Sequence, residues 1–233
     1  MTDDVITTSP PGETSSIPSV KSSDQLLQWV YQLIRPYTKG GILEVGSGDG
    51  DMASLFVLDK APLSVSDPHA RNCYALKKMF EGEPLIQRIR RIDLLHKEFN
   101  TKYERYLDKF DTVMCLHSID HQNDHSLMLN NAKKLLSNRG RLIVLLPAWA
   151  ALFGESDEGF HDWLKCNHRH LRKLLGRDVE FLNTQYFTLL KPPIASNPPV
   201  DQYHQEVPIF EVSEKKSLCR RGLSVIVVAR IIK

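Results

Sequence analysis

Cysteine is scarce in this chain, and its spacing offers no metal or redox motif. Four cysteines occur among 233 residues, and no two of them form the C-x-x-C spacing of a zinc site or a redox pair: Cys73, Cys115, Cys166 and Cys219. Cys115 lies in an apolar run, which predicts a buried core thiol. The pattern therefore indicates no bound metal, and it favours a reducing compartment over a disulfide scaffold.

Long apolar runs are also absent. No stretch approaches the ~20 residues that span a bilayer, and the N-terminus lacks the basic and apolar regions of a secretion signal. We therefore expect a cytoplasmic protein with no membrane partner. The formal net charge is only +2, which is too balanced to indicate nucleic acid or an anionic membrane surface as the main partner.

The sequence divides into a polar tail and one domain. Ser, Thr, Pro and acidic residues dominate residues 1–23 and predict a disordered tail, because this composition buries little apolar surface. Residues 24–233 are enough for a single sizeable α/β domain. Within it, residues 191–217 hold five prolines and show no clear period, so we expect a loop or lid there.

Strand and helix patterns alternate along most of the domain. The predicted strands are 41–46, 62–67, 85–93, 110–118, 141–147, 179–189 and 222–232, and the predicted helices include 51–59, 69–81, 124–137 and 163–175. We expect a left-handed cap at Asn138-Arg139-Gly140 after the helix 124–137. Strands that are apolar on both faces and separated by helices predict a doubly wound α/β fold, with a mostly parallel sheet covered on both sides.

The most informative stretch is Glu44–Gly50, which follows an apolar strand and leads into a helix. Its glycines permit positive φ and let the backbone approach a ligand at the carboxyl edge of the sheet. The spacing G-x-G-x-G differs from the G-x-G-x-x-G of nicotinamide dehydrogenases and argues against that class. Acidic Glu44 and Asp49 suit a cationic ligand better than a pyrophosphate. A plain strand-to-helix turn is the alternative interpretation.

Two carboxylates follow the second and third predicted strands. Asp67 lies 17 residues after Gly50, where an acidic side chain can accept both ribose hydroxyls of an adenosine. Alternatively, Asp67 is a turn residue before Pro68. Asp93 can accept from an adenine amino group, with Leu94 packing near the ring. Alternatively, Asp93 caps a helix or a turn.

Taken together, these motifs resemble the class I S-adenosylmethionine-dependent methyltransferases. The resemblance covers residues 25–150 through the runs GGILEVGSGDG, SVSDPH, RIDLL, FDTVMCLHSIDH and GRLIVLLPA. Two further runs, LPAWAALFGESDEGFH and GLSVIVVARI, resemble a bacterial-type subgroup of that family. The resemblance implies a Rossmann-like sheet of seven strands with the last strand antiparallel, and S-adenosyl-L-methionine as the cofactor.

The resemblance also implies a role for each residue of the site. Glu44 would orient the loop and approach the cofactor's ammonium group directly or through water. Asp67 would bind the ribose and Asp93 the adenine. The cofactor-binding residues that the resemblance implies are Glu44, Gly46, Ser47, Gly48, Gly50, Asp67, Pro68, Asp93, Leu94, Leu116 and His117.

Few catalytic residues are expected. Methyl transfer from a sulfonium needs an aligned nucleophile and the exclusion of water, and it needs a base only when the acceptor must lose a proton. His121 and His161 border the carboxyl edge of the predicted sheet and are the candidate bases, with a surface or structural role as the alternative. Asp120-His121 matches an acidic-His pair of the subgroup, in which Glu is the usual acid.

The expected acceptor is a small molecule, methylated on oxygen, nitrogen or carbon. The Asn/Asp-Pro-Pro-aromatic motif that many nucleic-acid and protein amino-methyltransferases carry after the fourth strand is replaced here by Leu116–Ile119. We therefore expect no nucleic-acid partner, and a monomer or a homodimer. Two alternatives stay open: a protein or nucleic-acid methyltransferase, and a catalytically inactive S-adenosylmethionine-binding protein.

Overall fold

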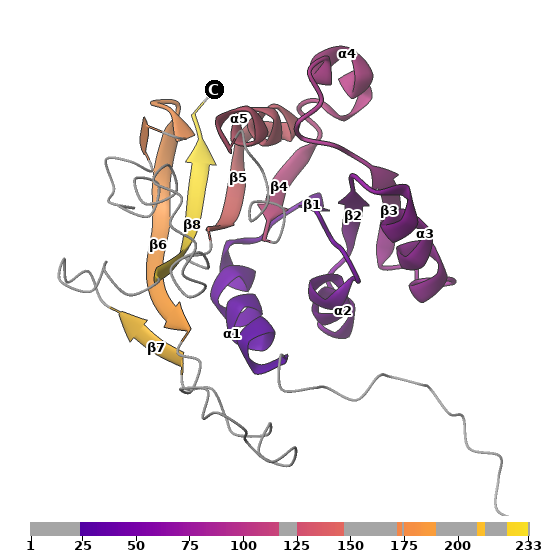
Figure 1. The fold of residues 1–233 in the computed structure, drawn as a ribbon, viewed down its shortest axis with the longest axis horizontal. Helices are drawn as coiled ribbons and strands as arrows, with labels where there is room; N and C mark the ends of the chain where they lie inside the picture. The colour runs from indigo at the N-terminus through magenta and orange to yellow at the C-terminus, as the bar shows by residue number, and fades with distance from the viewer. Residues whose placement is uncertain are drawn as a thin grey trace, which may run out of the picture.

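The computed structural model describes residues 24–116, 125–146, 172–173, 175–189, 209–212 and 223–232 (Figure 1). Its helices are α1 (Asp24–Ile34), α2 (Asp51–Leu58), α3 (Ala70–Met79), α4 (Phe99–Lys102) and α5 (His125–Leu135), with the 3-10 turns η1 (Arg35–Tyr37) and η2 (Glu104–Tyr106). Its strands are β1 (Ile42–Val45), β2 (Leu63–Asp67), β3 (Ile86–Arg91), β4 (Phe110–Cys115), β5 (Leu136–Leu146), β6 (Val179–Leu189), β7 (Ile209–Val212) and β8 (Leu223–Ile231). The predicted tail and most of the predicted helix 163–175 lie outside the described residues.

These strands form one sheet, in the order β3-β2-β1-β4-β5-β8-β6-β7. The strands from β3 to β5 pair in parallel. β8 inserts between β5 and β6 and runs antiparallel to both. The prediction of a Rossmann-like, mostly parallel sheet whose last strand is antiparallel is therefore confirmed.

Two local predictions need correction. The segment 191–217, predicted as a loop or lid, contains the strand β7, which pairs antiparallel with the end of β6 and makes the sheet eight-stranded. This pairing is long-range, so the proline-rich composition around β7 did not reveal it. The helix predicted over 124–137 ends at Leu135, and the strand predicted from residue 141 begins at Leu136. The left-handed residue of the expected Asn138–Gly140 cap is Arg139 (φ 58°), which lies within β5.

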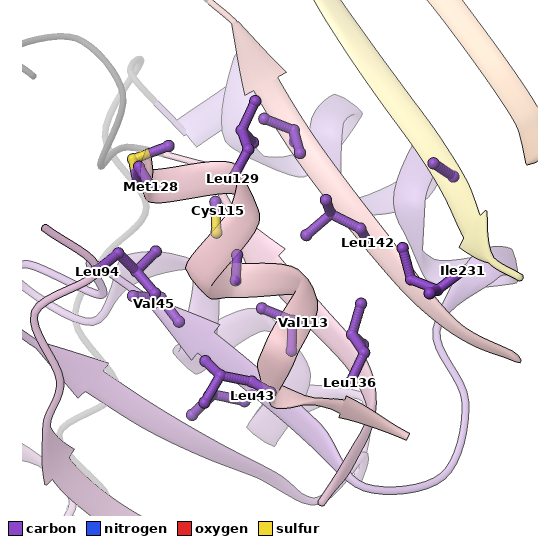
Figure 2. Close-up of a cluster of buried hydrophobic side chains, with 14 of the residues drawn as sticks. Leu43, Val45, Leu94, Val113, Cys115, Met128, Leu129, Leu136, Leu142 and Ile231 are labelled. Carbon is purple, nitrogen blue, oxygen red and sulfur yellow. The ribbon is translucent and has the colours of Figure 1, made fainter. Parts of the chain in front are cut away.

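The sheet is covered by helices on both faces, as predicted. Alternate residues of a strand point to opposite faces. On β1, Leu43 and Val45 join a core cluster with α5 residues such as Leu129 (Figure 2). Ile42 joins the second cluster, to which Phe56 of α2 belongs. Accordingly, α1, α2 and α3 lie on one face of the sheet, and α4 and α5 lie on the other (Figure 1).

The edge position of β3 explains its unusual sequence. Arg88, Arg90 and Arg91 are exposed, whereas Ile86 and Ile89 are half-buried against the core. An edge strand has only one neighbour, and charged side chains there oppose edge-to-edge pairing with other molecules. The arginines that interrupt the apolar pattern are therefore compatible with a strand.

Candidate functional site

The loop after β1 lies at the edge of the sheet where adjacent parallel strands end together. Its backbone is left-handed at Gly46 (φ 78°), Gly48 (φ 51°) and Gly50 (φ 85°), a conformation that favours glycine. The N–H groups of Gly46 and Ser47 donate to the Ser66 carbonyl at 2.8 and 2.9 Å. These hydrogen bonds attach the glycine loop to β2, so the sheet fixes the conformation of the loop.

Gly48 and Gly50 are required for different reasons. A Cβ on Gly50 would lie 2.9 Å from Leu76 Cδ2 and 3.0 Å from Phe80 Cε2, so Gly50 lets α3 pack closely against the loop. A Cβ on Gly48 would meet no atom of the described residues within 4 Å. The backbone at Gly48 therefore faces open space, where a ligand can lie directly on it.

Glu44 is buried beneath this loop. It is only 1% exposed, and its Oε2 atom has no hydrogen-bond partner among the described residues. In the sheet, it lies between Val65 of β2 and Met114 of β4. Burial raises the pKa of Glu44 to about 7; the Ser47 hydroxyl acts in the opposite direction, and the charge of Asp51 adds to the rise. Glu44 is thus an acidic group with an unsatisfied oxygen.

Asp67 ends β2 and contacts the glycine loop directly. Its Oδ2 accepts the N–H of Gly48 at 3.1 Å, and its Oδ1 accepts the N–H of His69 at 2.8 Å and lies 3.2 Å from His69 Nδ1. It therefore acts as a turn residue, one of the two interpretations of the sequence. A carboxylate has about four acceptor positions, so these bonds leave capacity for a ribose hydroxyl.

A pocket opens on the other side of β1. It is lined by Val45, Pro68, Ile92, Asp93, Leu94, Leu95 and Met128. Asp93 is its charged residue; it is half-buried, and its Oδ1 accepts the N–H of Leu95 at 2.9 Å. The pocket is small and open to solvent, and its apolar lining with one carboxylate suits one face and edge of a planar ring that carries an amino group. The structure thus brings Pro68, Asp93 and Leu94 together, as the sequence predicted.

Two residues that the sequence analysis missed hold this pocket in shape. The hydroxyl oxygen of Tyr103 accepts the N–H of Asp93 at 3.0 Å. The side-chain amide of Asn131, which is fully buried on α5, donates to the Leu94 carbonyl at 2.7 Å. The only sequence signal for Asn131 was a polar residue inside the apolar stripe of an amphipathic helix. A buried side-chain amide needs hydrogen-bond partners. A polar residue in such a stripe therefore indicates that its side chain bonds the backbone of another segment and holds that segment in place.

The candidate residues after β4 and β5 are only partly described. Leu116, just past β4, is buried with 2% exposure. His117 and the candidate bases His121 and His161 lie outside the described residues. Within the described ranges, no cluster of His, Cys, Asp or Glu side chains is arranged to hold a metal ion. In the same part of the chain, no helix is long and apolar enough to cross a membrane.

Comparison with known proteins gives the family. The parallel sheet with a glycine loop at its carboxyl edge defines a Rossmann-like α/β protein, and residues 21–180 match the model of the methyltransferase domain family. None of the curated proteins matches the sequence. Because the match covers more than half of the chain, the protein belongs to the methyltransferase domain family.

Solved structures share the fold at low sequence identity. Magnesium protoporphyrin IX methyltransferase from Synechocystis, solved with bound SAH, has a TM-score of 0.55 at 17% identity over 90% of this chain and 83% of that chain. The N-methyltransferase NodS from Bradyrhizobium japonicum has a TM-score of 0.53 at 12% identity, over 91% and 97%. A protein from Pyrococcus horikoshii has a TM-score of 0.57 at 10% identity, over 91% and 94%. At these identities, the likeness concerns the fold alone.

The site residues fit the cofactor of this family. S-adenosylmethionine carries an ammonium, and the unpartnered Oε2 of Glu44 is an acidic acceptor beneath the loop. The bare backbone at Gly48 has room for an amino-acid moiety. The pocket beside Asp93 is apolar except for one carboxylate, which matches an adenine ring with its amino group.

Proposed function

We propose that this protein is an S-adenosylmethionine-dependent methyltransferase that methylates a small-molecule acceptor on oxygen, nitrogen or carbon. One observation carries the cofactor assignment: an unpartnered carboxyl oxygen, an open glycine backbone and an apolar pocket with a carboxylate lie along one sheet edge, at Glu44, Gly48 and Asp93. The strand order β1-β2-β3 places the β1 loop, Asp67 and Asp93 in succession along that edge, as the amino-acid moiety, the ribose and the adenine follow one another in the cofactor.

Asp67 lies between the glycine loop and the apolar pocket. It is bonded to the loop through Gly48 and is followed by Pro68, which lines the pocket. The ribose lies between the amino-acid moiety and the adenine in the cofactor, so Asp67 is the carboxylate suited to its hydroxyl groups. Because Asp67 is 3% exposed, a hydrogen bond to it is strengthened by the low local dielectric.

The chemistry follows from this placement. The cofactor supplies an electrophilic methyl group on a sulfonium. The protein fixes that group relative to the acceptor and excludes water around it. In this proposal, Leu116 and His117 line the cofactor near the sulfonium. His121 or His161 removes a proton from acceptors that must lose one.

Asp67→Asn tests the cofactor assignment. Loss of a buried, charge-assisted contact to the ribose is worth roughly 1.5–3 kcal/mol, so the Kd for S-adenosylmethionine in calorimetry should rise at least tenfold. Glu81→Gln is the matched control, since Glu81 is an exposed acid outside the site and its loss should not change the Kd. Thermal unfolding of both variants separates a lost ligand contact from a distorted loop. Unchanged affinity of the Asp67 variant would remove the ribose assignment.

A transfer assay tests the acceptor class. The protein is incubated with methyl-labelled S-adenosylmethionine and a cell extract, which is then separated into metabolite, protein and nucleic-acid fractions. We expect label among the metabolites. Label in the protein or nucleic-acid fraction would replace the small-molecule proposal with that acceptor class. Saturable cofactor binding without label in any fraction would indicate an inactive cofactor-binding protein.

A further inference from the structure

Glu44 combines deep burial with an incomplete set of partners. Its side chain is enclosed between β1 and the α1–α2 layer, on the face that also holds Phe56 and Met114. With 1% exposure, it has almost no access to water that would solvate an ionised carboxylate. A buried carboxylate with one unpartnered oxygen is costly, and protonation removes that cost.

The charges around Glu44 do not neutralise it in the described part of the structure. Titratable groups on the elements packed on its face include Tyr31, Arg35, Tyr37, Asp51, Asp59, Asp67, Arg141 and Arg230. Arg35 bonds Asp59 at 2.6 Å, and Arg230 pairs with Glu180 at 3.2 Å. Arg141 donates through Nη1 to the Tyr37 carbonyl at 2.8 Å, and its Nε has no partner among the described residues. None of these cations lowers the pKa of Glu44. Asp51 repels the ionised form, and together with burial it raises the pKa of Glu44 to about 7.

We propose that the cofactor-free protein holds Glu44 protonated in mildly acidic solution, and that binding of S-adenosylmethionine expels this proton into solvent. This inference rests on the proposed function. The carboxyl O–H bond breaks, its electron pair stays on the carboxylate, and the proton passes to the buffer. The cofactor's ammonium would supply the counter-charge at Glu44, because an opposite charge within about 4–6 Å favours the ionised form of a carboxyl.

Binding should therefore depend on pH in a defined direction. Because the cofactor selects the ionised carboxyl, protons compete with it. Below the pKa of Glu44, affinity should rise about tenfold per pH unit, and above it affinity should level off. An ordinary exposed glutamate would be ionised throughout this range and would give no such slope.

Proton counting by calorimetry tests the inference. S-adenosylmethionine is titrated into the wild-type protein about one pH unit below and one above the pKa of Glu44, each in two buffers of different ionisation heat. We expect close to one proton released per cofactor at the lower pH. At the higher pH the cofactor's own α-amino group, with a pKa of about 8, takes up part of a proton on binding as an ammonium. The difference between wild type and Glu44→Gln removes this shared contribution, and it should be close to one proton released at the lower pH and almost none at the higher.

Asp51→Asn provides a second variant that leaves Glu44 in place. Asp51 is exposed on the first turn of α2, and its charge raises the pKa of Glu44. Its removal should move the midpoint of proton release to lower pH. Glu81→Gln, with the same change in net charge at a remote site, should leave the midpoint unchanged.

The outcomes separate this inference from the proposed function. Saturable binding without proton release from the wild-type protein overturns the inference and leaves the function standing. Equal release from wild type and Glu44→Gln also overturns it. The absence of any saturable binding overturns the proposed function and the inference with it. If Glu44→Gln does not fold, infrared difference spectra of the wild type replace it: the band of a protonated carboxyl should disappear on cofactor addition, and a persistent band refutes the inference.

Discussion

The two sides of the candidate site are built in different ways. The polar wall, defined as Glu44, Gly46, Gly48 and Asp67, is shaped by backbone hydrogen bonds and left-handed glycines. It contains a buried oxygen that has no partner within the described ranges. The apolar pocket is defined as Val45, Pro68, Ile92, Asp93, Leu94, Leu95 and Met128. Several of its residues belong to the main hydrophobic core cluster.

This difference has a consequence for stability. An unpaired buried carboxyl and positive-φ positions cost folding free energy, so the polar wall is held in place at the expense of stability. Burial of apolar side chains contributes to stability, so the pocket is part of what holds the fold together. Substitutions should therefore separate binding from stability in the polar wall and reduce both together in the pocket.

The largest effect is expected in the apolar pocket, from Met128→Ala. Met128 is 1% exposed and belongs to the core cluster (Figure 2), so truncation should lower the free energy of unfolding by about 2–5 kcal/mol. The Kd for the cofactor should rise several-fold, because about 1 kcal/mol of apolar contact is lost. Chemical denaturation and calorimetry measure the two quantities.

Leu129→Ala is the matched control for this substitution. Leu129 is also 1% exposed in the same cluster but does not line the pocket. It should lose comparable stability and keep the wild-type Kd. If both variants bind the cofactor equally well, the pocket does not hold the adenine.

In the polar wall, Glu44→Gln should change stability in a pH-dependent way. The pKa of Glu44 is raised from 4.5 to about 7 in the folded protein, so the folded state holds this proton more tightly than the unfolded state. Wild-type stability should therefore fall as pH rises from the unfolded value to the folded one, and then level off. At 1.36 kcal/mol per pKa unit, this loss is about 3 kcal/mol.

The glutamine variant lacks this titration. Relative to wild type, it should gain about 3 kcal/mol between acidic pH and mildly alkaline pH, while its affinity for the cofactor falls. Urea unfolding at both pH values, without ligand, provides the measurement. Parallel pH profiles of the two proteins would mean that Glu44 is ionised in the folded state, and that the polar wall carries no such cost.

The polar wall was the more predictable side from sequence. The stretch Glu44–Gly50 is continuous, and its glycines occupy positions whose left-handed backbone excludes most other residues. The strand pattern places Asp67 at the end of a strand, and for the apolar pocket it places Asp93 in the same way. Local sequence therefore determined both the loop and the carboxylates of the site, because adjacent parallel strands end at the same edge.

The features of the site and fold that the sequence did not predict depend on contacts between residues far apart in the chain. Asn131 reaches the Leu94 carbonyl across 37 positions of sequence, and Met128 completes the pocket from α5. The pairing of β7 with β6 is likewise non-local. Periodicity reports which face of an element is apolar, but it does not report which backbone group a buried amide will meet. The lack of a hydrogen-bond partner for the Glu44 Oε2 among the described residues could not be predicted for the same reason, since it depends on all the elements packed around that side chain.

The smallest stability effect should come from Gly48→Ala, which also gives the sharpest separation of binding from folding. Its Cβ would meet no described atom within 4 Å, so the folding cost is the strain of a positive φ, about 1 kcal/mol. Gly82→Ala is the matched control, because Gly82 also has positive φ (77°) and open space but lies in the turn after α3. Both variants should lose similar stability in thermal unfolding. Only Gly48→Ala should weaken cofactor binding at least tenfold, because its methyl group occupies the surface on which the ligand rests. Equal affinities for the two variants would place the ligand away from the polar wall.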